Sequence, residues 1–176
     1  MDMLTIREKK VDDCQKIFFL PYTEKDRLDK VFHILSEKEK IRANLIKNLD
    51  SLKQFVFGRY LMRCVLGMEG KDFLYNEFGK PFIQGNIFFN LSHAKGLIVL
   101  IVSEGKETGI DVEINSGNKI AWTRFESYIK SQGKGLSGIE FKDFCGLDKG
   151  RIFPIKTEIM SFYGKEYVLS HCYKFK

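Results

Sequence analysis

The sequence has little of what a thiolate metal site, a disulfide framework or a membrane span would need. Its 176 residues include four cysteines and three histidines, and no two cysteines form a C-x-x-C pair. Such scattered thiols do not predict zinc binding or disulfides. No apolar run approaches bilayer-spanning length, and charges run through residues 1–20, unlike a secretion signal. We therefore expect a soluble cytoplasmic protein with no membrane partner.

What the sequence does contain is enough apolar material for one sizeable core. Hydrophobic residues make up 44% of the chain, which predicts a single compact domain over 1–176. The net charge of +6 and the pI near 9.0 favour an anionic partner, such as nucleic acid, a phosphorylated cofactor or an acidic protein. The basic residues are dispersed, and no aromatic-basic stacking motif or helix-turn-helix pattern is present, so we expect no nucleic-acid partner.

The first half of the chain predicts two strands followed by helices. Residues 3–7 and 17–22 have strand character, and apolar positions recur at helical spacing over 24–35. Ser36 and Glu39 have the form of a capping box, which begins a second helix. The apolar residues expected to face inward from that helix are Ile41, Leu45 and Leu49.

A third helix is expected to begin at Asp50 or Ser51 and to end at Gly67. Its broad apolar stripe predicts a core helix. Arg59 and Arg63 are four residues apart on one side of it, and we expect them to be solvated charges at its margin.

The second half is richer in strand patterns. Residues 87–91, 97–103 and 109–114 predict an antiparallel meander, and Ser92 and His93 fall where its first strand should end. After Gly138, the segments IEFKDF, RIFPIKTEIMSF and KEYVLSHCYKF predict three closing strands. Because each half combines short strands with at least one long helix, we expect an α+β fold with two similar lobes, approximately 1–90 and 91–176.

Four charged residues in the centre have spacings that regular structure can bring together. Asp111 and Glu113 are two apart on a predicted strand, so their side chains leave the same face. Glu126 and Lys130 are four apart on a predicted helix that also carries the apolar stripe Trp122, Phe125, Tyr128 and Ile129. This helix can dock on the sheet and direct both polar groups along the contact.

Three carboxylates at one contact repel each other unless a cation or protons neutralise them. Mg²⁺ fits such a set, because it prefers oxygen ligands and is commonly shared with substrate phosphates. Lys130, Lys80 and His93 would then donate hydrogen bonds to the remaining phosphate oxygens, which predicts a diphosphate site. For each motif alone a structural interpretation stays open: a solvated strand face, a surface ion pair on a helix, a loop lysine or a structural histidine.

The order of these motifs resembles the 4′-phosphopantetheinyl transferases, most closely the surfactin-synthetase-activating (Sfp) type. The helix over 54–67 also looks like that family's first-lobe helix. The matching segments are Gly79–Pro81, Phe89–His93, Gly109–Glu113, Trp122–Lys130 and Gly133–Leu136.

The resemblance implies two similar, pseudo-duplicated α+β lobes with the active site in the cleft between them. It also implies transfer of the phosphopantetheine arm of coenzyme A to a serine of an apo acyl or peptidyl carrier protein. The reaction releases 3′,5′-ADP and requires Mg²⁺. Since one chain would hold a complete cleft, we expect a monomer.

By position, the resemblance assigns metal binding to Asp111, Glu113 and Glu126, and a proposed base role also to Glu126. Lys130 matches the lysine that contacts the phosphates and helps protonate the leaving group. The matching coenzyme A contacts are Lys80, Ser92 and His93, with His93 also in the catalytic set, and Arg42 falls near a basic position for the 3′-phosphate.

One alternative within the family stays open, namely a degenerate relative that binds coenzyme A or a carrier protein without transferring anything. Two departures from the family pattern motivate it. The bridge INSGNKIA at 114–121 is shorter than usual, and Phe125 stands where a lysine usually precedes the glutamate.

Overall fold

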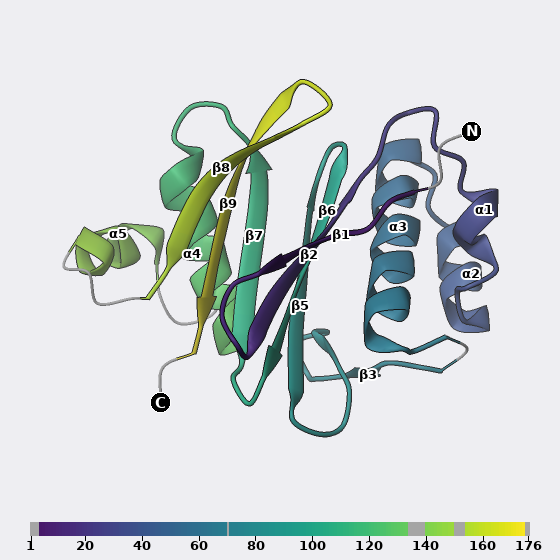
Figure 1. Ribbon diagram of the computed structural model, residues 1–176, viewed down its shortest axis with the longest axis horizontal. Helices are drawn as coiled ribbons and strands as arrows, with labels where there is room; N and C mark the ends of the chain where they lie inside the picture. The colour runs from purple at the N-terminus through teal and green to yellow at the C-terminus, as the bar shows by residue number, and fades with distance from the viewer. Residues whose placement is uncertain (1–3, 70, 134–139, 150–153, 175–176) are drawn as a thin grey trace.

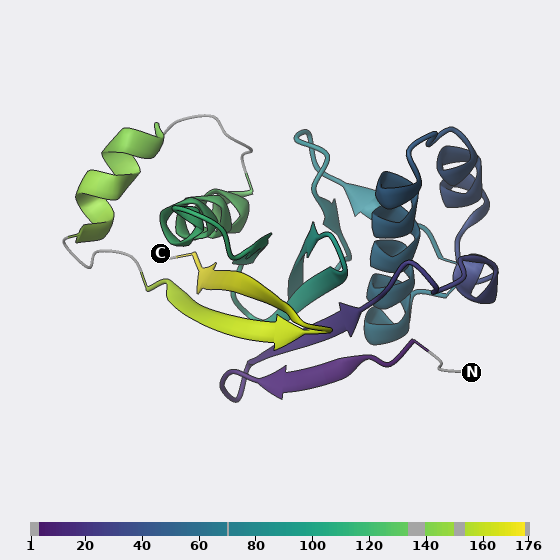
Figure 2. The ribbon, with the colours of Figure 1, turned by 90° about the horizontal axis from the view of Figure 1, so that it is seen from above.

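The computed structural model describes residues 4–69, 71–133, 140–149 and 154–174. The elements form layers in which helices lie outside two central sheets: helices α1 to α3, a first sheet, a second sheet, then α4 and α5 (Figures 1 and 2). The elements are β1 (Arg7–Lys10), β2 (Gln15–Pro21), α1 (Asp29–Phe32), α2 (Glu37–Asn44), α3 (Leu49–Leu66), β3 (Leu74–Tyr75), β4 (Pro81–Phe82), β5 (Ile87–Ala94), β6 (Leu97–Glu104), β7 (Thr108–Ile114), α4 (Lys119–Gln132), α5 (Phe141–Lys149), β8 (Lys156–Phe162) and β9 (Lys165–Tyr173).

The first sheet is antiparallel, with strand order β1-β2-β6-β5. Helix α3 covers one of its faces and buries Val56, Phe57 and Leu61 completely, together with Ile98 and Leu100 of β6. The predicted end of α3 at Gly67 is confirmed, because this residue has the left-handed φ of 61° that favours glycine at a helix C-terminus. At the other end the N-cap is Asn48, not the predicted Asp50 or Ser51.

The second sheet has the order β7-β9-β8, so the predicted meander of β5, β6 and β7 is wrong at its third strand. β6 already pairs with β2 on one edge and with β5 on the other. No free edge remains for β7, which pairs with β9 instead. The hairpin of β8 and β9 confirms the last two predicted strands as far as the structure describes them.

An apolar cluster joins the two sheets. It contains Ile17 of β2, Val99 of β6, Val112 of β7 and Leu169 of β9, all almost completely buried. The chain passes from the first sheet to the second between Glu104 and Thr108. The structure is mixed α+β, as predicted, while the similarity of two lobes stays a prediction.

The segment IEFKDF was predicted as a strand, but α5 occupies most of it. The reason is the aromatic packing against α4: the ring of Phe125 lies 5.3 Å from that of Phe141 and 5.4 Å from that of Phe144, centre to centre. A spacing of three places both rings on one side of a helix, whereas on a strand they would leave opposite faces. The predicted apolar stripe of α4 is confirmed, with Phe125 and Ile129 buried.

Helix α2 has its predicted capping box of Ser36 and Glu39, but its apolar side faces outward. Ile41, Leu45 and Leu49 are 63%, 75% and 61% exposed. Glu39 and Ala43 are buried in their place. The ion pair between Glu39 and Arg63 of α3 explains this rotation, because it turns Glu39 and the residue four further on toward α3.

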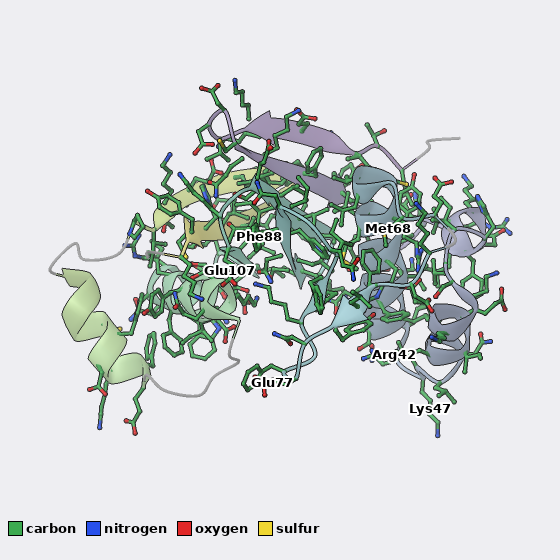
Figure 3. The ribbon with its side chains drawn as sticks, turned by 90° about the horizontal axis from the view of Figure 1, so that it is seen from below. Arg42, Lys47, Met68, Glu77, Phe88 and Glu107 are labelled. Atoms are coloured by element: carbon green, nitrogen blue, oxygen red, sulfur yellow. The ribbon has the colours of Figure 1, made fainter. Side chains whose placement is uncertain are left out.

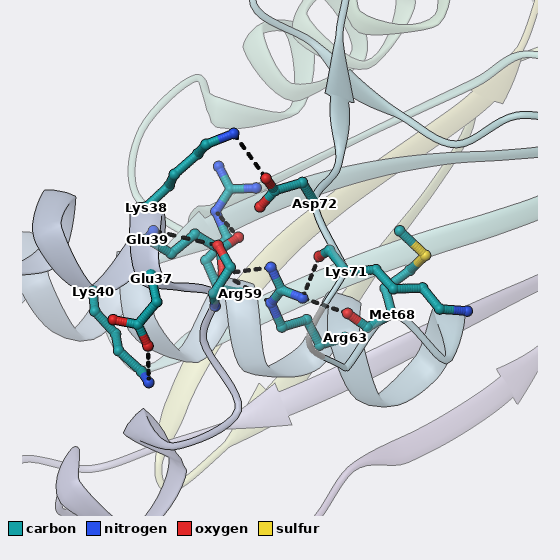
Figure 4. A network of polar contacts seen from close by, with 10 residues as sticks. Glu37, Lys38, Glu39, Lys40, Arg59, Arg63, Met68, Lys71 and Asp72 are labelled. Carbon is teal, nitrogen blue, oxygen red and sulfur yellow. Dashed lines mark hydrogen bonds and ion pairs between the residues drawn. The ribbon is translucent and has the colours of Figure 1, made fainter.

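The arginines of α3 are therefore not the solvated charges that the pattern predicted. Arg63 Nε and Nη2 each lie 2.8 Å from Glu39 Oε2. Nη1 donates to the carbonyls of Met68 and Lys71 (Figure 4). Arg63 has 0% exposure. Arg59 approaches the same carboxylate, with its Nε 3.6 Å from Glu39 Oε1.

The predicted helix over 24–35 is also much shorter than expected. Asp26 accepts hydrogen bonds from the main-chain N–H and the hydroxyl of Thr23, which holds the start of this segment in a turn. Only α1 is helical there, with Val31 buried. Within the described residues, no helix is long and apolar enough to cross a membrane.

Candidate functional site

The candidate site lies where β5 of the first sheet runs beside β7 of the second. Asn90 Oδ1 accepts a hydrogen bond from the N–H of Ile110 at 3.0 Å, and Ser92 Oγ accepts from the N–H of Val112 at 3.3 Å. Both partners advance by two residues in the same direction, so the strands are parallel. Two side chains of β5 thus replace a main-chain ladder, and we call this pair of bonds the clasp.

Asp111 lies at the centre of the site and is 5% exposed. Its Oδ1 accepts hydrogen bonds from Ser92 Oγ at 2.8 Å and from Lys130 Nζ at 2.5 Å. Lys130 Nζ also lies 3.2 Å from Ser92 Oγ. Asp111 Oδ2 is buried and has no hydrogen-bond partner, so half of the carboxylate is satisfied and half is not.

Glu126 and Glu113 complete the acidic set. Glu126 Oε2 lies 3.9 Å from Lys130 Nζ, and Glu113 Oε2 lies 3.5 Å from Lys119 Nζ. Burial raises the pKa of Glu126, Lys130 opposes this rise, and the charges of Asp111 and Glu113 add to it. We use the name "seam" for Ser92, Asp111, Glu113, Glu126 and Lys130.

The close approach of α4 to β7 depends on Gly109. A β-carbon there would lie 2.0 Å from the carbonyl oxygen of Ser127 and 2.4 Å from the amide nitrogen of Ser131. Any other residue would push the helix away. Small buried side chains on the same side of α4 allow this packing, namely Thr123, Ser127 and Ser131, each with 0% exposure. Glu126 and Lys130 are thereby held beside Asp111.

His93 lies within β5, not in a loop after it, because this strand continues to Ala94. Its side chain is exposed to solvent at the surface, yet its pKa is lowered, first by loss of hydration among the neighbouring groups and next by the charge of Lys130. The charges of Asp111 and Glu113 also act on it. The structure therefore brings His93 near the seam as a neutral imidazole at pH 7.

Lys80 reaches the same region but uses its ammonium on the main chain. Nζ donates to the carbonyl oxygen of Lys130 at 2.9 Å and lies 3.4 Å from that of Thr108. Burial lowers its pKa. Asn76 shapes the loop before it, since its Oδ1 accepts from the N–H of Lys80 and its Nδ2 donates to the carbonyl of Gly133. The sequence did not point to Asn76.

Arg42 is the predicted site residue that the structure does not bring to the seam. It lies on α2, with its guanidinium 5.3 Å from the centre of the Phe55 ring. Figure 3 places it among the helices of the first half, well apart from Glu107 in the loop before β7. Its predicted 3′-phosphate contact gains no support from this position.

The two sequence departures have a structural basis. Phe125 is 4% exposed and packs between α4 and α5, so it faces the aromatic cluster and not the seam. The short bridge after β7 is anchored at Asn115, whose N–H donates to the carbonyl of Glu166 at 2.9 Å. Helix α4 follows directly from Lys119.

A cavity of ≈ 290 Å³ borders the seam. Glu126, Lys130 and Asn90 line one part of it, and the loop residues Phe78 and Pro81 line another. A second cavity of ≈ 420 Å³ shares Lys80, Pro81 and Gly133 with it. Two charged groups of the seam, those of Glu126 and Lys130, thus face a space large enough for part of a small-molecule ligand.

The predicted metal ligands are neighbours, but they do not converge. Among the described residues, no three His, Cys, Asp or Glu side chains are placed so that they could hold a metal ion. An ammonium lies between two of the carboxylates instead. Their chemistry still suits a hard cation, because all the donors are carboxylate oxygens and the buried Asp111 Oδ2 has no partner.

The chain resembles two curated proteins in sequence. It is 30% identical to the 4′-phosphopantetheinyl transferase gsp of Aneurinibacillus migulanus, over 60% of this chain and 61% of that protein. It is 31% identical to the 4′-phosphopantetheinyl transferase HetI of a Nostoc species (strain PCC 7120), over 60% and 62%. No protein-family model matches the chain.

The alignments thus span about three fifths of the length of these relatives. Both relatives are 4′-phosphopantetheinyl transferases, so the similarity supports the superfamily predicted from the ordered motifs.

Proposed function

We propose that this chain transfers the 4′-phosphopantetheine arm of coenzyme A to a serine of an apo acyl or peptidyl carrier protein, releasing 3′,5′-ADP. The observation that carries this proposal is the seam itself, with Lys130, Asp111 and Ser92 in mutual contact beside Glu126 at the edge of a cavity. The proposed enzyme acts as a cytoplasmic monomer.

In the proposed reaction the seam's own residues move one proton and stabilise one leaving group. The carrier serine oxygen forms a bond to the β-phosphorus of coenzyme A, and the bond from that phosphorus to the bridging oxygen of 3′,5′-ADP breaks. Glu126 accepts the serine proton, a role that its raised pKa supports at neutral pH. Lys130 stabilises the charge on the departing phosphate.

The residues assigned to coenzyme A differ in how many hydrogen-bond donors they still have for its phosphates. Lys80 has used two of the three N–H groups of its ammonium on carbonyls, which leaves one for a phosphate. His93 is exposed to solvent and can donate from its neutral ring. Ser92 already holds Asp111 and Val112, so we assign it to positioning the seam.

Mg²⁺ belongs to this proposal as the metal that Asp111, Glu113 and Glu126 would hold. When bound, it would neutralise the carboxylates and the diphosphate oxygens.

The test is to incubate the full chain with coenzyme A, Mg²⁺ and a panel of apo carrier proteins, and to measure carrier mass. We expect at least one carrier to gain the phosphopantetheine mass. Glu126→Gln should abolish this gain without unfolding the protein. Glu158→Gln is the matched control, because Glu158 is also partly buried beside a lysine, Lys9, but lies outside the seam. If no carrier gains mass, the proposed activity is wrong.

A non-catalytic relative is the second candidate, favoured by the buried Phe125, which gives the seam no polar group. Calorimetry with coenzyme A and Mg²⁺ separates the two. Tight binding without turnover on any carrier would support the second candidate, and turnover would reject it.

A further inference from the structure

Lys130 already occupies the position in which a cation is expected. Its Nζ lies 2.5 Å from Asp111 Oδ1 and 3.9 Å from Glu126 Oε2. These are two of the three carboxylates assigned to the metal. The ammonium supplies the positive charge that a buried aspartate requires.

The seam still contains more negative than positive charge. Its three carboxylates face two ammonium groups, those of Lys130 and Lys119. Asp111 is the carboxylate with too little positive charge around it, because its buried Oδ2 has no hydrogen-bond partner. One ammonium therefore neutralises the carboxylate only in part.

Lys130 and a divalent cation cannot both contact these oxygens. At such separations the repulsion between an ammonium and a dication would be strong in a partly buried site. The lysine side chain is 28% exposed and has a flexible stem. Its ammonium can therefore swing outward while Gly109 keeps α4 in place against β7.

We propose that Lys130 is the resident counter-ion of the seam, and that a divalent cation binds Asp111 and Glu126 by displacing its ammonium into the adjacent cavity. This inference rests on the metal site of the proposed function. It adds that Lys130 competes with the metal before substrate arrives. The displaced ammonium, still tethered to α4, lines the cavity where phosphates would bind.

The experiment measures Mn²⁺ binding to the full chain by electron paramagnetic resonance, without coenzyme A or carrier. Lys130→Met should bind Mn²⁺ about tenfold more tightly than the natural chain, because the competing charge is gone. The matched control is Lys119→Met. It removes a charge from the same helix, where the ammonium of Lys119 pairs with Glu113. It should change the affinity by less than about threefold.

Melting temperatures measured with and without Mn²⁺ test the same exchange of the Lys130 ammonium for the metal ion. Without metal, Lys130→Met leaves Asp111 without its cation, so its melting temperature should fall, and Mn²⁺ should restore it. Lys130→Gln is the second variant, because its neutral amide can still donate to Asp111 if the methionine variant fails to fold. It should also tighten Mn²⁺ binding. The double variant Asp111→Asn with Lys130→Met should lose the metal response.

Unchanged or weaker Mn²⁺ binding in Lys130→Met and Lys130→Gln overturns the exchange. If the natural chain and these variants bind Mn²⁺ equally, and the natural chain transfers phosphopantetheine to a carrier, the exchange is wrong and the proposed function stands. If none of these proteins binds Mn²⁺, the exchange is wrong, and transfer in the presence of a chelator then decides whether the proposed function needs a metal.

Discussion

Two clusters of buried charge differ in the sign of their excess. Around Glu39, the guanidiniums of Arg59 and Arg63 share one carboxylate, so positive charge is in excess. In the seam, three carboxylates share the ammonium groups of Lys130 and Lys119, so negative charge is in excess. The first cluster fixes helices, and the second borders a cavity.

The chain itself accommodates most of the positive excess. Arg63 donates to the carbonyls of Met68 and Lys71 as well as to Glu39, and its guanidinium carbon lies 5.3 Å from the centre of the Phe73 ring. Two buried nitrogens of the cluster, Arg59 Nη1 and Arg63 Nη2, make no hydrogen bond, although Arg63 Nη2 lies 2.8 Å from Glu39 Oε2. The rings of Phe55 and Tyr75 under Arg59 compensate for this in part. Carbonyls and ring faces are acceptors that a folded chain has in abundance.

The negative excess has fewer internal remedies. A carboxylate only accepts hydrogen bonds, and the nearby amides of Ile110 and Val112 are already used by the clasp. Asp111 Oδ2 is left without a donor. An excess of buried cations can thus be structural, whereas this excess of carboxylate favours a cation or donor from outside the chain.

Breaking the Glu39 cluster should have the largest effect on stability. Arg63→Ala leaves the buried Glu39 with the more distant guanidinium of Arg59, at 3.6 Å, and the N–H of Ser36. We expect this to lower the free energy of unfolding by about 3–5 kcal/mol. Urea unfolding measures this loss. Transfer per folded molecule should be unchanged, because the cluster does not touch the seam.

The control for Arg63→Ala is Lys38→Ala, which removes the exposed ion pair with Asp72 (Figure 4). We expect no measurable change in stability. If Arg63→Ala unfolds no more easily than Lys38→Ala, the cluster is not the structural element that the comparison requires.

Breaking the clasp should have a smaller effect on stability and a second effect on catalysis at the seam. Asn90→Ala removes the acceptor for the N–H of Ile110, and we expect a loss of about 1–3 kcal/mol in unfolding free energy. Because β7 carries Asp111, the turnover number for transfer should also fall, more than the KM for coenzyme A rises. The exposed Asn86→Ala, on the same segment, should change neither quantity. A stability loss with unchanged turnover would show that the clasp does not position the seam.

The sequence predicted which charged residues lie together in the seam, because short periodicities determine their placement. A spacing of two on a strand and of four on a helix placed Asp111 with Glu113 and Glu126 with Lys130. In the structure the first two lie on β7, and the second two form an ion pair on α4. The predicted apolar stripe of α4 is buried for the same reason. Local spacing did not indicate the clasp, since the partners of Asn90 and Ser92 lie twenty residues away.

The wrong predictions share a dependence on distant residues. The exposed Ile41 and Leu45 have a spacing typical of a buried stripe, but the pair between Glu39 and Arg63, 24 residues apart, sets the rotation of α2. The placement of β7 required the knowledge that β2 already occupies the far edge of β6. Neither fact can be read from a local window of sequence.

A titration of stability makes the smallest and most specific distinction between the clusters. Burial raises the pKa of Glu126 above its ordinary 4.5. At a pH between the ordinary pKa of the unfolded chain and the raised pKa of the folded protein, the folded protein keeps a proton that the unfolded chain has released. The free energy of unfolding should therefore decrease as pH rises through this window. Urea unfolding at several pH values should show this slope in the natural chain and in Glu158→Gln, but not in Glu126→Gln.

Removing Lys130 should shift the same titration in a predictable direction. The charge of Lys130 lowers the pKa of Glu126, so this pKa should rise further in Lys130→Met. The decrease in the free energy of unfolding should then extend to higher pH. Lys38→Ala, at the edge of the Glu39 cluster, should leave the window where it is. If Lys130→Met narrows the window, then Lys130 does not act on Glu126 as a counter-ion, and the seam is not held together by the charge that its geometry indicates.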